Sequence, residues 1–208
     1  MSLFQDAHLL VALKPSGLLS VPGRGPDKQD CLSARVQHMH PQALVVHRLD
    51  QATSGLMLFA LSSDVQRRLS MAFEARQVRK TYHAWVEGVL PKQADWQTID
   101  LPILLDWPNR PVHIIDPQGK PSQTRWRCIE HRPALPASLL ALQPLTGRTH
   151  QLRLHLKAMG HPIWGDALYA PPEVQARSPR LLLHASELGL AHPITQLDMH
   201  WVCPPDFV

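Results

Sequence analysis

Asp50 is the carboxylate that the sequence surrounds with the residue types expected of a catalytic site. It lies in the segment HRLDQATSGL (residues 47–56), two residues after Arg48. An aspartate in front of a turn is more often a residue that caps backbone N–H groups than a catalyst. A catalytic role needs a cation that keeps the carboxylate ionised, and the later segment TGRTHQLRLH offers Arg148 and Arg153. Asp50 is therefore either a turn residue or a nucleophile or base held by one of these arginines.

Metal and nucleotide chemistry find little support. The histidine pairs His38 with His40 and His150 with His155 lack the further ligands that a zinc site requires, and no HExxH motif is present. A phosphate loop of the Walker type, a dinucleotide fingerprint and a serine nucleophile elbow are also missing from the sequence. We therefore expect no metal and no cofactor, and a reaction that a carboxylate and arginines can carry out.

Composition favours a protein that stays in a reducing compartment. Cys31, Cys128 and Cys203 are far apart and form no CxxC pair, which argues against a disulfide scaffold. No stretch approaches the roughly 20 consecutive apolar residues that a membrane span needs, and the N-terminus lacks the pattern of a secretion signal. We expect a cytoplasmic protein that does not contact a membrane.

The charge balance allows a polyanionic partner. Lysine and arginine number 21 against 17 acidic residues, for a net charge of +4, and arginine far outnumbers lysine. The planar fork of arginine suits phosphate groups and stacking on bases. Genome composition explains the same bias equally well, so charge alone does not identify the partner.

The elements that must position these residues are predicted from periodicity. Apolar patterns predict strands over residues 8–13, 43–50, 56–61 and 81–90 and helices over 31–39 and after the capping residue Ser62. The segment 149–162 is ambiguous, because Leu152, Leu154 and Leu156 alternate as in a strand, whereas Leu152, Leu156 and Met159 fit a helix. Gly160 followed by His161 and Pro162 is a helix stop, so we predict a helix there. On this reading Asp50 stands at the end of a strand. Short strands separated by the turns DWPNRP and DPQGKP fill residues 95–142. Strands and isolated helices without a regular βαβ rhythm predict an α+β fold.

A basic edge is predicted beside the helix that follows Ser62. Its apolar residues fall on one face, and its other face and the strand after it carry the candidates for RNA-phosphate contacts Arg67, Arg68, Arg76, Arg79 and Lys80. An ordinary solvated face is the alternative reading. Tyr82, at the end of this edge, is equally compatible with a core aromatic.

Four blocks in a fixed order give the chain its strongest signal. They are HRLDQATSGL, KTYHAWVEG, TGRTHQLRLH with GHPIWGDALY, and RLLLHA. Together they resemble the RluA family of pseudouridine synthases, and the likeness covers nearly the whole chain. The resemblance implies a pseudouridine synthase fold, with a mixed, mainly antiparallel central sheet, flanking helices and a central catalytic cleft. It also implies one catalytic domain over residues 1–208, without an N-terminal S4-like RNA-binding domain.

The resemblance assigns roles to named residues. It implies that Asp50 is the catalytic aspartate, that Arg153 pairs with it, and that Tyr82 stacks on the target base. His47 and Arg48 would stand at the point where a flipped base leaves a vacancy in the RNA. Leu182 or Leu183 would give the apolar wall of the uracil pocket, although both are equally ordinary core leucines. Further substrate-binding candidates are Thr53 and Arg148.

The implied reaction breaks the N-glycosidic bond of a uridine, rotates the base, and rejoins it through carbon 5. A tRNA anticodon stem-loop and a loop of large-subunit (23S) ribosomal RNA are the expected substrates, and a monomer is expected. Three alternatives remain: the same chemistry on one RNA class, a non-catalytic RNA-binding or RNA-folding protein, and an enzyme that acts on nucleosides or phosphosugars.

Overall fold

The computed structural model describes residues 2–132 and 134–208. The chain forms two compact units. The first contains the chain up to Lys80 together with Ala185–Asp206 and Val208, and the second contains Thr81–His184 with Phe207. Strands β5 (Arg79–Glu87) and β11 (Leu183–Ala191) carry the chain from one unit to the other. The expectation of one catalytic domain stays a prediction.

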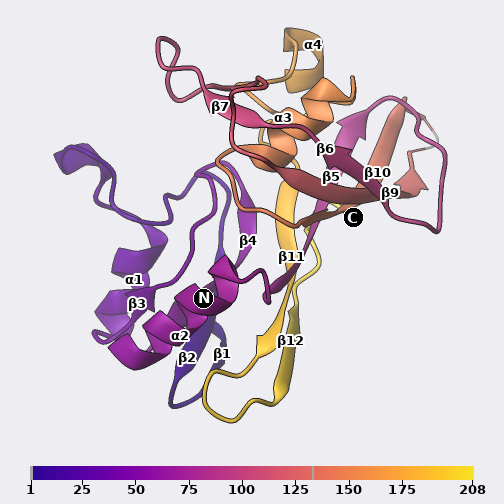
Figure 1. The fold of residues 1–208 in the computed structure, drawn as a ribbon. Coiled ribbons are helices and arrows are strands. Elements are labelled where there is room, and N and C mark those ends of the chain that lie inside the picture. Colours follow the sequence, from indigo (N-terminus) through magenta and orange to yellow (C-terminus); the bar gives the residue numbers. More distant parts are fainter. Residues whose placement is uncertain (1, 133) are drawn as a thin grey trace. The chain divides into compact units, whose positions relative to one another are not determined.

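The first unit is built on a β-sheet (Figure 1). Its neighbouring strands are β1, β2, β4 and β11, with β3 added to β4 and β12 added to β11. The bounds are β1 (Ser2–Gln5), β2 (Leu9–Lys14), β3 (Leu44–Val45), β4 (Ser54–Ala60) and β12 (Asp198–Val202). The remaining elements are the short 3₁₀ turn η1 (Pro26–Lys28), α1 (Leu32–Met39) and α2 (Ser63–Glu74).

Strand β4 is buried along its whole length. Leu56 and Leu58 join a core with Val65 and Leu69 of α2, which packs against β3 and β4. Gly55 has φ +123°, and a Cβ there would lie 2.4 Å from the backbone of Ala185 in β11. Only glycine lets the two backbones approach so closely.

Helix α2 follows the sequence prediction closely. The Ser62 hydroxyl accepts a hydrogen bond from the Val65 N–H at 3.3 Å, as expected for an N-cap. Val65 and Leu69 are buried, which confirms the predicted apolar face. The placement of Arg76 on this helix was wrong, because the helix ends at Glu74 and Arg76 takes a left-handed conformation with φ 59°. Its phosphate contact stays a prediction.

The second unit contains the strand order β5, β10, β9, β6 and a separate hairpin of β7 and β8. The bounds are β6 (Gln97–Asp100), β7 (Ile103–Leu105), β8 (His113–Ile115), β9 (Gln123–His131) and β10 (Ala137–Pro144). Helix α3 (Gln151–Ala158) packs against β8, β9 and β10, and α4 (Pro172–Gln175) is a single turn. Strands and separate helices in this order confirm the predicted α+β class.

Helix α3 resolves an ambiguity in the sequence. Leu152, Leu154 and Leu156 alternate as in a strand, yet the segment is helical, with hydrogen bonds such as Leu154 N–H to the His150 carbonyl at 2.9 Å. Every residue from Gln151 to Leu156 is buried. A helix buried on all sides can have apolar residues at any spacing, so the alternation of leucines does not distinguish a strand from a helix here.

The prediction that Asp50 ends a strand was wrong. Strand β3 stops at Val45, and Asp50 lies five residues later in an irregular segment. In the antiparallel register Val45 faces Phe59, so the next β4 residue to be paired would be Leu58. The N–H of Leu58 instead donates to the imidazole Nε2 of His47 at 3.0 Å. The imidazole of His47 therefore accepts the hydrogen bond that a backbone carbonyl of a longer β3 would have accepted.

Candidate functional site

The segment around Asp50 is held by the turn KPSGLLS, residues 14–20. The Ser20 hydroxyl donates to the Leu49 carbonyl at 2.6 Å and accepts from the Leu49 N–H at 3.0 Å. The Ser16 hydroxyl donates to the Ala52 carbonyl at 2.7 Å. Asp50 itself is partly buried, and its carbonyl accepts from the N–H of the buried Thr53 at 3.1 Å. Both sides of Asp50 are thus fixed by hydrogen bonds from a distant segment.

Lys14 is a part of this site that the sequence analysis missed. Its side chain is fully buried, and its Nζ donates to the carbonyls of Pro15, Leu18 and Gln51 at 3.0, 2.7 and 2.9 Å. Burial lowers the pKa of Lys14 to about 8, and the nearby carboxylate of Asp50 opposes part of that shift. Three carbonyl acceptors match the three N–H bonds of the ammonium form, so Lys14 joins its turn to the residue after Asp50.

His47 acts as a structural side chain in the first unit. Besides accepting from the Leu58 N–H, its ring stacks on Phe73 of α2 with the ring centres 4.7 Å apart. Burial and the nearby charge of Lys80 lower the pKa of His47 to about 3. The imidazole is therefore neutral over the physiological range, and its Nε2 accepts a hydrogen bond within the unit. The predicted substrate contact of His47 stays a prediction.

Arg48 differs from its neighbour. Its side chain is exposed, and among the described residues its guanidinium has no hydrogen bond or ion pair. It stands two residues before Asp50, on a segment anchored by His47 on one side and Leu49 on the other. An exposed cation on a fixed backbone suits a contact with a ligand better than it suits a role in the fold.

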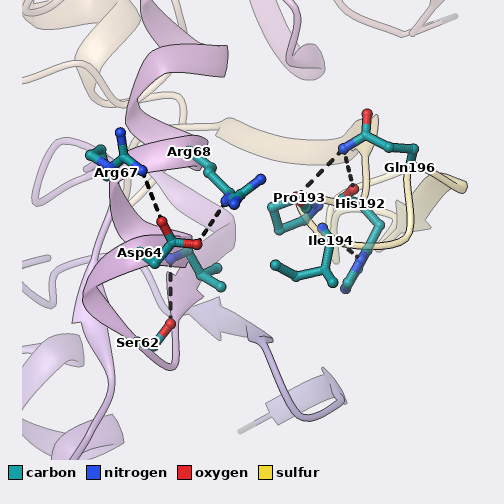
Figure 2. A network of polar contacts seen from close by, with 9 residues as sticks. Ser62, Asp64, Arg67, Arg68, His192, Pro193, Ile194 and Gln196 are labelled. Carbon is teal, nitrogen blue, oxygen red and sulfur yellow. Dashed lines mark hydrogen bonds and ion pairs between the residues drawn. The ribbon is translucent and has the colours of Figure 1, made fainter.

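Most of the predicted phosphate-binding residues have partners within the chain. Arg67 and Arg68 converge on the carboxylate of Asp64 at 2.9 and 2.7 Å, as Figure 2 shows. Arg79 pairs with Asp198 at 2.6 Å, and the Lys80 ammonium lies 5.9 Å from the centre of the Phe73 ring. Exposed pairs of this kind contribute about 0–1 kcal/mol, so a phosphate group can displace the carboxylate.

In the second unit, Arg153 projects from α3 into the interior. Only 4% of its side chain is exposed, and it makes a two-pronged ion pair with Asp166, from Nε at 2.8 Å and from Nη2 at 2.6 Å. The ring of Tyr169 lies beside the guanidinium, 5.1 Å from ring centre to Cζ. The GDALY segment was recognised in the sequence, but Asp166 and Tyr169 were not assigned to a site.

The remaining predicted residues also lie in the second unit. Tyr82 is partly buried on β5, opposite Leu142 of β10. Leu182 packs in a core with Trp85 and Trp164, and Leu183 is buried at the start of β11. Both leucines thus have the core surroundings that their alternative reading required.

Arg148 is exposed in the turn before α3, and its backbone N–H donates to the Gln151 side chain at 3.0 Å. Asp50, His47, Arg48 and Thr53 belong to the first unit, whereas Tyr82, Arg148 and Arg153 belong to the second. The pairing of Asp50 with Arg153 would join the two units and stays a prediction.

Among residues 2–132 and 134–208, no group of three or more His, Cys, Asp or Glu side chains could hold a metal ion. Within the same residues, no helix is long and apolar enough to cross a membrane.

The chain is similar to known proteins along nearly its whole length. It is 47% identical over 206 residues to the dual-specificity RNA pseudouridine synthase RluA of Yersinia pestis, a match that covers 99% of this chain and 98% of the relative. The relative of the same name from Escherichia coli strain K12 is also 47% identical, with 99% and 93% of the two chains covered. The sequence-family model described as RNA pseudouridylate synthase matches residues 8–158.

Solved structures agree with the sequence matches. The human RNA pseudouridylate synthase domain containing 1 superposes with a TM-score of 0.81 at 30% identity, covering 100% of this chain and 84% of the other. The human RNA pseudouridylate synthase domain containing 4 gives a TM-score of 0.76 at 27% identity, covering 99% and 89%. These matches confirm the predicted pseudouridine synthase fold. The chain belongs to the RluA family of RNA pseudouridine synthases.

Proposed function

We propose that the protein isomerises specific uridines in two structured RNAs, a tRNA anticodon stem-loop and a loop of 23S ribosomal RNA, with Asp50 as the essential carboxylate. Near-full-length identity of 47% to relatives named as dual-specificity RNA pseudouridine synthases is the observation that supports two substrates. The rigid setting of Asp50 supports the catalytic role, because a reacting group gains most when its position is fixed before the substrate arrives.

The reaction starts when Asp50, ionised, attacks the uridine or removes a proton from its sugar. Arg153 orients the carboxylate through a charge-assisted hydrogen bond. The N-glycosidic bond breaks, the freed base rotates while Tyr82 stacks on it, and carbon 5 forms the new bond to the ribose. The proton on carbon 5 is then lost and one is gained at nitrogen 1, so substrate and product have the same atoms.

Arg48 fills the space that the flipped uridine leaves. An extruded base creates a vacancy, and a side chain that enters it prevents the base from returning. The guanidinium of Arg48 is exposed and has no partner among the described residues, which supports this role. His47 supports Arg48 indirectly, because its ring ties this segment to β4 and α2.

RNA phosphates contact the exposed cations around these groups. Arg76 and Arg148 are exposed and have no ion pair among the described residues, so no carboxylate competes with phosphate for them. Arg148 has only a long hydrogen bond to give up, from its Nε to the Pro121 carbonyl at 3.4 Å. Arg67, Arg68 and Arg79 bind phosphate only by giving up Asp64 or Asp198, which lowers their net contribution. We further propose that the protein works as a monomer in the cytoplasm.

A tritium-release assay tests the proposal. Stem-loop RNAs carrying uridine labelled at carbon 5 should release tritium with the wild-type protein, because carbon 5 loses its proton during the reaction. Free uridine and UMP should release none, because remote contacts with a folded RNA supply the energy for flipping. No release from any cellular RNA would favour a non-catalytic RNA-binding protein, and turnover of the free nucleoside or nucleotide would favour a small-molecule enzyme.

A further inference from the structure

A group of cations in the second unit has no carboxylate partner. Lys92 is exposed, Arg125 and Arg127 of β9 are partly exposed, and among the described residues none of the three forms an ion pair. We infer that these cations and Trp96 form a secondary RNA-binding site, the β9 patch, for a single-stranded part of the RNA outside the stem-loop that carries the target uridine. The inference rests on the proposed function, because it takes the RNA substrate as the ligand.

Trp96 brings the two arginines of the patch together. Arg125 and Arg127 are two positions apart on β9, so their side chains leave the same face of the strand. The guanidinium Cζ atoms lie 5.3 and 4.8 Å from the centre of the Trp96 ring. A cation over an indole ring is attracted to the ring face, which offsets part of the repulsion between the two like charges. The ring therefore holds both guanidinium groups near one another without a carboxylate between them.

The hydrogen bonds of these arginines are poorly satisfied by the protein. Among the described residues, Arg125 makes no side-chain hydrogen bond, and Arg127 makes only a long one, from Nη1 to the Ala94 carbonyl at 3.4 Å. The Nε of Arg127 is buried and has no hydrogen-bond partner in the described part of the chain. A buried donor without an acceptor is costly, so this guanidinium gains more from an anionic acceptor than a solvated one does.

An open hollow beside Arg127 gives a ligand room. The segment that contains Lys92 runs along β9 and pairs with it at Cys128, so that one cation lies on each side of the hollow. Asp95 and Glu130, the acidic residues closest in the sequence, are exposed and form no ion pair with the patch among the described residues. The hollow has a volume of about 310 Å³, a size that suits one nucleotide, and is lined by Lys92, Gln93, Ala94, Arg127, Cys128 and Ile129.

The patch lies on the face of its sheet opposite to Tyr82. The hydroxyl of Thr124 accepts from a side chain of α3 at 3.0 Å, so α3 covers the Thr124 face of β9. Tyr82 pairs with Leu142, and Leu142 pairs with Trp126, which places Tyr82 on this same face. The arginines alternate with these residues and leave the other face. Strand β6 is the last in the strand order, so an RNA that contacts both faces passes around β6.

This placement predicts which RNA uses the patch. A compact stem-loop that presents its uridine to Tyr82 covers one face of the sheet, whereas an RNA with single-stranded extensions is long enough to reach the other. Unpaired nucleotides suit the patch, because phosphates bind the guanidinium edges and bases stack on guanidinium planes and on indole rings. The β9 patch should therefore strengthen the binding of extended RNA and leave the binding of the minimal stem-loop unchanged.

The test compares a stem-loop substrate with the same stem-loop extended by single strands at both ends. Filter binding over a range of salt concentrations gives the affinity, and urea unfolding verifies the fold. Loss of two phosphate contacts in Arg125→Gln/Arg127→Gln should lower the salt slope for the extended RNA by about 1.4 and its affinity about 25-fold at about 0.1 M salt. Lys120→Gln is the control, because Lys120 is an exposed cation of the same unit outside the patch.

Two further variants keep the test decisive if the double variant folds poorly. Arg125→Gln alone should lower the salt slope by about 0.7, and Trp96→Leu should weaken extended RNA several-fold with an unchanged slope, because it removes no charge. Equal losses on both RNAs would overturn the inference. Unchanged binding of the extended RNA would also overturn it and would favour an acidic protein as the partner. Wild-type protein that released no tritium from the stem-loop would refute the proposed function, whereas active wild type with unimpaired variants would refute only the β9 patch.

Discussion

Acid should destabilise the protein through His47 before its carboxylates are protonated. The folded His47 has a pKa of about 3, whereas an unfolded histidine has a pKa near 6.5. Between about pH 6.5 and pH 3, His47 is therefore protonated in the unfolded chain and neutral in the folded chain. Each such proton shifts the equilibrium toward the unfolded state, so the free energy of unfolding falls as the pH falls from about 6.5 toward 3.

The size of this effect follows from the gap between the two pKa values. The largest slope for one proton is about 1.4 kcal/mol per pH unit, so two units below pH 6.5 give an upper limit of about 2.7 kcal/mol. His47 keeps some contact with solvent, which screens its charge, and we therefore expect about 2 kcal/mol at pH 4.5. Protonation would also remove the acceptor of the Leu58 N–H and place a cation beside Lys80.

The measurement is urea unfolding at pH 7 and pH 4.5 for wild type and His47→Gln. Glutamine can accept from the Leu58 N–H but does not titrate, so the variant should lose about 2 kcal/mol less than wild type between the two pH values. His38→Gln is the control, because His38 is exposed on α1 in the same unit. Equal pH dependence in wild type and His47→Gln would refute the reasoning, as would a His47 pKa near 6.5 by NMR titration.

Three further predictions test the fold and the RNA contact. Gly55→Ala should destabilise the protein by about 4 kcal/mol or more in urea unfolding, because its Cβ would overlap the Ala185 backbone, whereas Gly147→Ala has no atom within 4 Å and should be nearly neutral. Ser62→Ala should cost about 1 kcal/mol through the lost cap of α2, and Ser62→Thr should keep most of it. Arg48→Ala should slow tritium release from a paired stem-loop more than from an unstructured RNA of the same sequence; equal losses on both would argue against a wedge role.

Local patterns predicted the elements well. The Ser62 cap and the spacing of Val65 and Leu69 are contained within a few residues, and they sufficed to predict α2. The stop at Gly160, whose φ is +82°, decided α3 over a strand. These features depend on short-range geometry, which a single sequence contains.

The segment before Asp50 shows where such patterns fail. Its apolar residues are buried or partly buried, as they would be in a strand, but side chains from elsewhere bind the polar backbone groups at this point. The N–H and carbonyl of Leu49 both bond to Ser20, and His47 takes the N–H of Leu58. Hydrophobic spacing reports burial and does not report which groups satisfy the backbone.

The partners within the site were the least predictable part. Lys14 binds the Gln51 carbonyl across 37 positions of the sequence, and nothing in the strand LLVALK distinguishes a buried lysine from an exposed one at the strand end. Asp166 follows a glycine and resembles a turn residue, so its pairing with Arg153 could not be separated from other pairings. Such choices depend on which segments meet in three dimensions.

The most direct test of the account is tritium release by Asp50→Asn. The substitution removes one charge with little change in volume, so fold and stem-loop affinity should remain while the single-turnover rate falls at least about 10⁴-fold, as for loss of a catalytic nucleophile. Asp27→Asn, an exposed carboxylate in the same unit, should keep the wild-type rate. A folded Asp50→Asn protein that still formed pseudouridine at a comparable rate would contradict the account.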